Sequence, residues 1–250
     1  MKKDIDIRAS VKSIMEMDDD SNHSDFEGIA SEDVGIPFIS ILQDLSPQVK
    51  KGPGKVDGAE SGDIYESVNQ HVWKNGLDVV PCAFQKRWIE WVPRDSGGGF
   101  VRSHIDEEIL NQTQADSKGR TFLPNGNEIV PTAIHFVLAI PNNGLDSFRA
   151  IISMVRTQRK KSKNWLGKMM TNKFTGPTGR VYTPRMCRYS YLMTTITETR
   201  DNNTYYNWNI GKAKLLEDES IYQEALNFAN TFTTQRIDFG DGKNVIEDVI

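Results

Sequence analysis

The sequence holds few of the residues that mark secreted, membrane-spanning or zinc-binding proteins. Only Cys82 and Cys187 occur among its 250 residues, and neither belongs to a C-x-x-C pair. So little cysteine favours two free buried thiols over a disulfide framework or a zinc site. The chain also has no run of about 18 apolar residues, so we expect no membrane-spanning helix and no membrane partner.

Sequence motifs for catalysis are missing as well. The chain has no phosphate-binding G-x-x-x-x-G-K-[ST] loop, and the glycines after Ser96 lack the spacing of a nucleophile elbow. The four histidines are scattered, and His135 lies within the apolar run TAIHFVLAI, which is typical of a strand. His104 lies close to acids at residues 106–108, which leaves a metal-dependent nuclease as one alternative. We expect no enzymatic activity, no cofactor and no metal site.

Acidic residues are absent from residues 147–197, although the chain contains 34 Asp and Glu overall. This segment has eleven Lys and Arg and a formal net charge of +11, whereas the whole chain has −4. Residues 1–35 and residues 216–250 each have a net charge of −6. Such segregation of charge indicates a polyanionic partner for the basic segment. The alternatives are a solvated basic face, a nuclear localisation signal in RKKSK, or an acidic protein partner.

Composition divides the chain into three regions. Residues 1–35 predict a flexible acidic N-terminal arm, and residues 236–250 predict an acidic C-terminal tail. Residues 36–235 hold many short strand patterns, including TAIHFVLAI and SFRAIISMV around an Asn-Gly turn. An apolar stripe at helical spacing over residues 217–232 predicts a C-terminal helix. We therefore expect a mainly β (α+β) domain, a Greek-key barrel with insertions, one basic helix and this C-terminal helix.

The basic stretch RTQRKKSKNWLGKMM, residues 156–170, predicts a helix with two different faces. Trp165 and Met169 are four residues apart and form a short apolar face. The cations recur at three- and four-residue spacing, which suits contact with a phosphate backbone. We expect phosphate contacts from Arg156, Arg159, Lys160, Lys161 and Lys163.

Cations and aromatic residues also alternate outside this helix. In FQKRWIEWVPR, residues 84–94, a strand would place only one of Trp88 and Trp91 toward a ligand, and we favour the face of Arg87 and Trp91. Single-stranded nucleic acid is bound by cations along a groove and by exposed aromatic rings that stack on bases. The sequence predicts stacking by Trp91, Trp165, Tyr182 or Tyr189. It predicts further phosphate contacts from Lys168, Arg180, Arg188, Arg87 and Arg94.

Four stretches are informative in combination: ILQDLSPQVKKG, GAESGDIY, RWIEWVPRDSGGGF and TQRKKSKNWLGKMM. Together with the aromatic hairpin and acidic end that follow them, they resemble the single-stranded-DNA-binding proteins of tailed phages. The resemblance covers roughly residues 36–235. It implies an OB-fold core and sequence-nonspecific binding of single-stranded DNA. It also implies a role in phage replication and recombination, in the cytoplasm of the infected bacterial host.

The acidic ends predict a form of regulation. A mobile acidic tail would compete with DNA for the basic groove and would recruit phage or host replication proteins once DNA is bound. Homo-oligomerisation stays open. The alternative function is that of a virion structural or assembly protein, in which the basic segment binds an acidic partner subunit.

Overall fold

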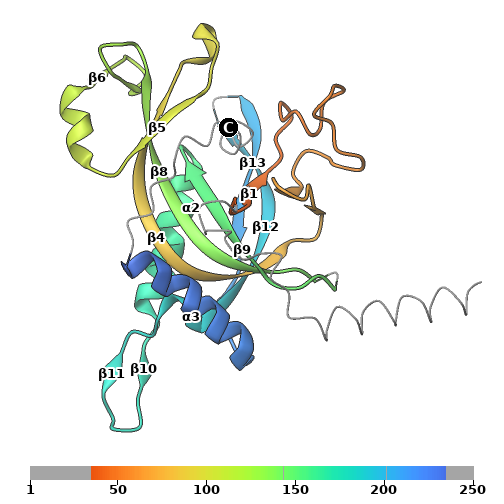
Figure 1. Cartoon of the computed structure of the whole chain (residues 1–250), viewed down its shortest axis with the longest axis vertical. Coiled ribbons are helices and arrows are strands. Elements are labelled where there is room, and N and C mark those ends of the chain that lie inside the picture. The colour runs from red at the N-terminus through yellow and green to blue at the C-terminus, as the bar shows by residue number, and fades with distance from the viewer. Residues whose placement is uncertain (1–34, 143, 201, 235–250) are drawn as a thin grey trace, which may run out of the picture. The chain divides into compact units, whose positions relative to one another are not determined.

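The computed structural model describes residues 35–142, 144–200 and 202–234 (Figure 1). Contacts divide the chain into two units, Met1–Gly35 and Ile36–Ile250. Apart from Gly35, the arm predicted over residues 1–35 lies outside the described residues, and so does the tail predicted over residues 236–250. All of the elements named below belong to the second unit.

Five long strands form the centre of the main sheet. Their order across the sheet is β13-β12-β4-β8-β9, and each neighbouring pair is antiparallel. Numbered along the chain, the first long strand (β4) lies between the second (β8) and the fourth (β12). A helix follows the third (β9), and this arrangement is that of a Greek-key OB barrel. The predicted mainly β, OB-like fold is therefore confirmed. The strands are β4 (Leu77–Trp91), β8 (Glu128–Ile140), β9 (Phe148–Val155), β12 (Tyr189–Arg200) and β13 (Asn203–Ile210).

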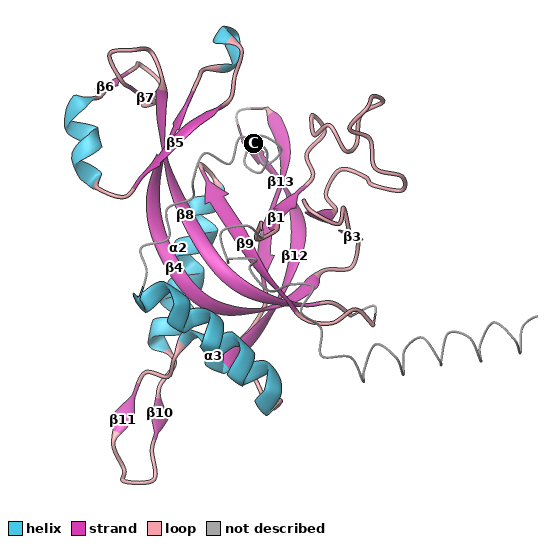
Figure 2. Ribbon diagram, in the orientation of Figure 1, coloured by secondary structure: helices cyan, strands magenta, loops and turns pink. Residues whose placement is uncertain are grey.

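The sheet curls because its two longest strands bend. Figure 2 shows β4 and β8 as long curved arrows that run side by side. Their register shifts between Pro81 and Ala83, which marks a bulge. Proline cannot donate to a strand ladder and is found at bulges or edges, so Pro81 suits this position.

A short N-terminal strand brings the two ends of the curled sheet together. Strand β1 (Phe38–Ile41) pairs in parallel with β9 and antiparallel with β2 (Ile64–Glu66), which in turn pairs with β3 (Val72–Trp73). Just after β1, the side-chain amide of Gln43 donates to the Tyr206 carbonyl on β13 and accepts from its N–H, both at 2.9 Å. One glutamine therefore supplies the pair of hydrogen bonds that a neighbouring strand would give.

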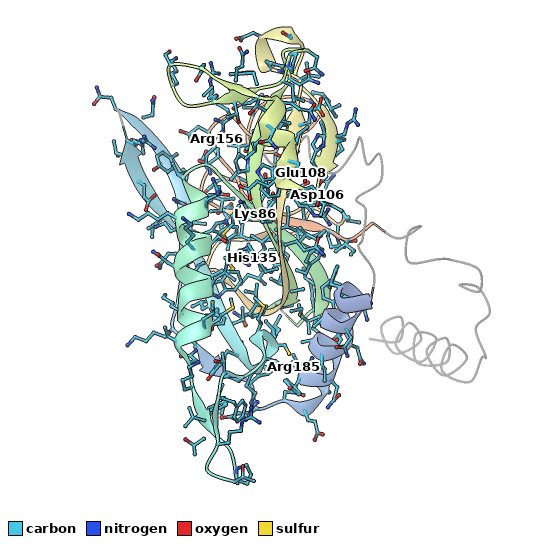
Figure 3. All side chains as sticks on the ribbon, turned by 90° about the vertical axis from the view of Figure 1, so that its left-hand side faces the viewer. Lys86, Asp106, Glu108, His135, Arg156 and Arg185 are labelled. Carbon is cyan, nitrogen blue, oxygen red and sulfur yellow. The ribbon has the colours of Figure 1, made fainter. Side chains whose placement is uncertain are left out.

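The two helices cover opposite faces of the sheet. Since side chains alternate along a strand, Val79 and Val137 point to the face covered by α2 (Gln158–Thr171). Val80 and Phe136 point to the other face, which is covered by α3 (Glu219–Thr234). Figure 3 shows α2 and α3 on either side of the strands. The predicted basic helix and C-terminal helix are therefore both present, and both are part of the core.

Insertions extend the two ends of the sheet. Between β4 and β8 the chain forms η1 (Arg94–Ser96), β5 (Phe100–His104), η2 (Glu107–Gln112), β6 (Gln114–Ala115) and β7 (Thr121–Phe122). After α2 it forms the hairpin of β10 (Phe174–Thr175) and β11 (Val181–Tyr182), then η3 (Met186–Arg188). Strand β14 (Lys214–Leu215) pairs with β12. Figure 1 shows the β10–β11 hairpin projecting from the end of the sheet opposite to β5 and β6.

The structure bears on two further predictions: that both thiols are free and buried, and that no helix spans a membrane. Cys82 and Cys187 are both buried and free, as the sequence predicts. Burial raises the pKa of the Cys82 thiol to about 12, so this group stays protonated and unreactive at neutral pH. None of the described helices is both long and apolar enough to cross a membrane.

Candidate nucleic-acid interface

Helix α2 separates its apolar and basic residues onto opposite sides. Ser162, Trp165 and Met169 are buried against the sheet, whereas Lys160 and Lys163 are exposed. With 3.6 residues per turn, the first three fall on one face and the two lysines fall on the other. The sheet-facing side therefore anchors the helix and leaves its basic side in solvent.

Trp165 lies in the core and does not present a ring to a ligand. Its side chain is 0% exposed, and its ring centroid lies 4.7 Å from that of His135 and 5.6 Å from that of Tyr191. His135 also forms a 2.8 Å hydrogen bond with Ser162, and burial lowers its pKa to about 3, so its ring stays neutral. The expectation that Trp165 stacks on a base is corrected, because neither face of its indole is open.

Four of the predicted phosphate-binding cations in the acid-free segment are engaged within the protein. Arg156 forms an ion pair with Glu128 at 3.2 Å, and Lys161 forms one with Glu198 at 2.6 Å. The bond from Lys161 is the main cause of the lowered pKa of Glu198. Lys168 donates to the carbonyl of Ile210 at 3.0 Å, and Arg188 donates to the carbonyl of Leu216. These side chains fix α2 and the hairpin base to neighbouring strands.

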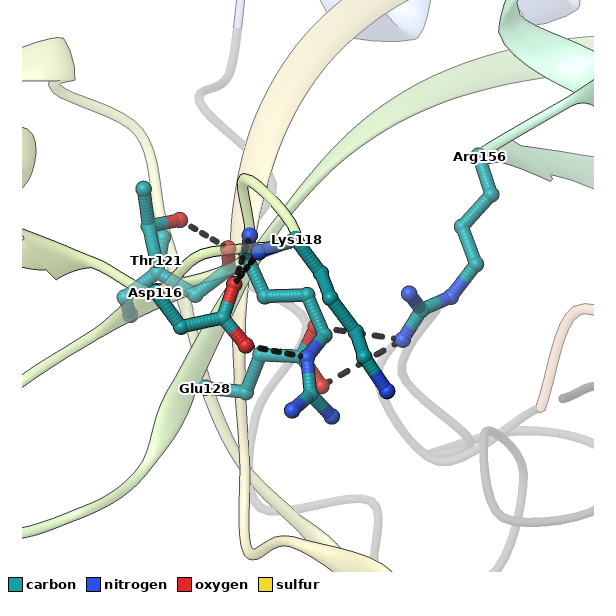
Figure 4. A network of polar contacts seen from close by, with 7 residues as sticks. Asp116, Lys118, Thr121, Glu128 and Arg156 are labelled. Carbon is teal, nitrogen blue, oxygen red and sulfur yellow. Dashed lines mark hydrogen bonds and ion pairs between the residues drawn. The ribbon is translucent and has the colours of Figure 1, made fainter.

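The ion pair of Arg156 also ties the start of α2 to the insertion. Glu128 begins β8 and pairs with Phe122 of β7, and β7 follows the turn in which Asp116 accepts hydrogen bonds from Arg120 and Lys118 (Figure 4). Arg156 itself has a φ of 46°, in the left-handed region that non-glycine residues adopt infrequently. The ion pair with Glu128 and this backbone conformation together fix where the chain enters α2, next to the insertion between β4 and β8.

Of the seven other cations in the segment, Arg149 lies over the Phe228 ring and Lys173 donates to the Thr183 hydroxyl. The other five are at least partly exposed. Lys160 and Lys163 on α2 and Arg180 and Arg185 at the hairpin are exposed, and Arg159 is half-buried. None of the five forms an ion pair with another residue in the described part of the chain. Tyr182 is 47% exposed between the hairpin arginines and leans on Phe174, with ring centroids 6.2 Å apart. We call this set the basic surface: Arg159, Lys160, Lys163, Arg180, Tyr182 and Arg185.

A family model of phage proteins matches this chain. The match is to the Pam3 phage gp34-like protein and covers residues 5–238. The chain belongs to the Pam3 phage gp34-like family. A search of curated proteins and a search of solved structures found no significant match.

The other predicted cluster of cations and aromatic residues, at residues 84–94, lies mostly inside the fold of this gp34-like chain. Arg87 is 2% exposed and donates to the side-chain oxygen of Gln85, and Trp91 is half-buried with its ring against Phe100 at 5.8 Å. The expectation that the Arg87 face is the exposed one is corrected, because the outer side of β4 is buried here. Tyr189 is also buried, at 9% exposure, and packs against Phe174 at 5.9 Å. The side chain of Arg94 lies outside the described residues.

The alternative site around His104 is a structural network. His104 hydrogen-bonds to the buried carboxylate of Glu90 at 2.9 Å, and Asn127 donates to the same carboxylate at 2.6 Å. Burial alone would raise the pKa of Glu90, but these hydrogen bonds and the nearby Arg102 lower it. Within the described ranges, no group of three His, Cys, Asp or Glu is arranged to hold a metal ion.

Helix α3 covers a face that the sequence does not single out. In OB folds, the face of the second and third strands binds oligonucleotides, and here these strands are β8 and β9. Phe136 on β8 is fully buried beneath α3, with ring centroids 6.4 Å from Phe228 and 3.8 Å from Phe232. Arg149 on β9 lies over Phe228 at 5.3 Å. This part of the face is core, so a ligand of this chain would bind elsewhere, and the basic surface is the candidate.

Proposed function

We propose that this phage protein binds single-stranded DNA through the basic surface, without sequence specificity and without catalysing a reaction. It would protect single strands during phage replication and recombination in the cytoplasm of the infected host. The observation that carries the proposal is a solvent-facing row of cations in a segment without any Asp or Glu. Unpaired cations of this kind repel one another, and a polyanion relieves that repulsion.

The charges of the basic surface suit a phosphate backbone. Each phosphate that is neutralised by Lys or Arg releases a condensed counterion, so affinity falls as salt rises. Arg159, Lys160 and Lys163 lie on the first two turns of α2, and the β10–β11 hairpin begins three residues after α2 ends. A strand bound along the basic side of α2 would therefore meet the cations of the hairpin if it followed the helix toward its C-terminal end.

The aromatic residue on the same surface favours a single strand over a duplex. Stacking of a base on an aromatic ring contributes about 1–3 kcal/mol and requires a base whose face is not already stacked. Tyr182 offers such a ring, since it is 47% exposed. The OB-like barrel is also a fold on which single strands are commonly bound.

A titration of labelled oligonucleotide tests the proposal. Tryptophan fluorescence is a poor signal for it, because Trp73, Trp88, Trp165 and Trp208 are all buried. Fluorescence anisotropy of a labelled mixed-sequence single strand, measured between low and high salt, is the better readout. We expect a Kd that rises steeply with salt, and weaker binding to a duplex of the same length. Absence of binding at low salt would reject the proposal and favour a virion assembly protein with an acidic protein partner.

A further inference from the structure

A groove lies between the β10–β11 hairpin and the start of α3. Its volume is about 610 Å³, within the range of about 300–1,000 Å³ that is typical of small-molecule sites. One wall comes from the hairpin and η3, and the other comes from the chain around the first turn of α3. Tyr182 and Arg185 line the first wall, and Glu217, Asp218 and Glu219 line the second.

The hairpin wall combines a flat ring with a flat cation. Tyr182 rests on Phe174, and Arg185 is exposed next to it. Figure 3 shows Arg185 near the lower part of the domain, where the hairpin leaves it. Arg188 fixes the base of the groove, because it donates to the Leu216 carbonyl and its guanidinium lies 5.9 Å from the Tyr222 ring. An aromatic ring and a guanidinium plane are the two side-chain surfaces on which bases stack.

The opposite wall is acidic, and two of its carboxylates are available. Asp218 is engaged, because it caps α3 by accepting from the N–H of Ser220 at 2.9 Å and of Ile221 at 3.3 Å. Glu217 and Glu219 are exposed and have no hydrogen-bond or ionic partner in the described part of the chain. Carboxylates repel phosphates but accept hydrogen bonds from the amino groups of bases. A strand in the groove would therefore keep its backbone on the basic side and turn a base toward the acids.

We propose that this groove binds a nucleobase of the single strand, with Tyr182 and Arg185 against its face and Glu217 or Glu219 at its amino edge. The inference rests on the proposed function and adds to it a modest preference for one pyrimidine over the other, within binding that does not depend on a defined base sequence. Cytosine presents an amino group to a carboxylate, whereas thymine, a pyrimidine of similar size, presents a carbonyl oxygen and a methyl group. The groove therefore favours cytosine over thymine.

Separate titrations of two pyrimidine oligonucleotides test the inference. Labelled oligo-dC and oligo-dT of equal length are titrated with the full chain at one salt concentration, and the ratio of the two Kd values is compared. We expect the wild type to bind oligo-dC about five- to tenfold more tightly, as suits one hydrogen bond that thymine cannot make. The Glu217→Ala/Glu219→Ala variant should bring the ratio close to one.

A matched variant separates base recognition from net charge. Asp106→Ala/Glu108→Ala also removes two exposed acids, but from the insertion at the other end of the sheet. It should tighten binding of both oligonucleotides by a similar factor and leave their ratio unchanged. Tyr182→Ala should weaken both, and Tyr182→Phe should restore both.

The outcomes for the groove and for the proposed function differ. Salt-dependent binding with equal affinity for oligo-dC and oligo-dT overturns the groove as a base site and leaves the proposed function standing. A preference for oligo-dC that survives in the Glu217→Ala/Glu219→Ala variant likewise overturns the groove alone. Failure of both oligonucleotides to bind overturns the proposed function and this inference together.

Discussion

The two helices of the domain use the same kind of anchor and present opposite surfaces. Helix α2 packs on one face of the sheet through Trp165, and α3 packs on the other through Phe228. Beyond these anchors, α2 exposes Lys160 and Lys163 and carries no acid, whereas the acids at residues 217–219 lie around the start of α3. The buried residues of a helix thus show how it packs in the fold. Only its exposed residues show whether it offers a candidate binding surface or merely shields the sheet from solvent.

The largest effect is expected from removal of either anchor. Trp165→Ala and Phe228→Ala should each lower the free energy of unfolding by about 3–5 kcal/mol, because each leaves a cavity in a close-packed core. Urea unfolding followed by circular dichroism measures this. Tyr182→Ala is the control, since an exposed ring should cost less than about 0.5 kcal/mol. A Trp165→Ala protein of unchanged stability with weakened DNA binding would contradict the assignment of Trp165 to the core.

The next effect concerns the buried histidine beneath α2. His135 has a pKa lowered to about 3 in the folded chain and an ordinary value near 6.5 when unfolded. Below pH 6.5 the unfolded state binds the extra proton, so stability should fall by about 1.4 kcal/mol per pH unit as the pH drops from 6.5 toward 4.5. Urea unfolding at several pH values measures the slope. In His135→Gln the slope over this window should be shallower by that amount, and an unchanged slope would contradict a neutral buried His135.

A smaller effect is expected on the exposed side of α2. Gly167 lies within the helix, and a Cβ added there would meet open space. Gly167→Ala should therefore raise the stability by about 1 kcal/mol, through helix propensity alone. Thermal unfolding checks the gain, and oligonucleotide anisotropy tells whether the strand approaches the helix backbone at this point. Loss of stability would show that the exposed face is packed against something.

The smallest effect is expected from the acidic C-terminal end. Truncation after residue 235 removes four acids and two bases, and with them a competitor for the basic surface. Affinity for single-stranded DNA should rise at low salt and converge with that of the full chain at high salt, because screening weakens the competition. Anisotropy titrations of the two chains measure the difference. Identical affinities at low salt would show that the acidic end does not compete with DNA for the basic surface.

Most of the fold could be predicted from the sequence because its signals are local. The apolar runs TAIHFVLAI and SFRAIISMV on either side of an Asn-Gly turn mark β8 and β9, and helical spacing marks α2 and α3. The role of Gln43 could not be predicted, since its partner Tyr206 is distant in sequence. Such closure depends on tertiary contacts that leave no periodic pattern.

The candidate site could be predicted only in part, for a similar reason. The acid-free segment indicates where the cations are concentrated, and Lys160, Lys163, Arg180 and Arg185 are indeed exposed. Composition does not reveal which cations are engaged by distant acids, as Arg156 is by Glu128 and Lys161 is by Glu198. Nor does a cluster of aromatic and basic residues reveal which of them lie inside the barrel.

One comparison of variants tests whether the basic surface governs DNA binding. Lys160→Gln/Lys163→Gln/Arg180→Gln removes three charges from the basic surface, and Lys50→Gln/Lys51→Gln/Lys55→Gln removes three exposed charges from the loop after β1. Salt-dependent anisotropy titrations of both variants use the same labelled single strand. The first variant should bind at least about tenfold more weakly, with a salt slope that is shallower by about 2, whereas the second should retain the slope of the wild type. Equal losses in the two variants would show that net charge, and not the basic surface, governs binding.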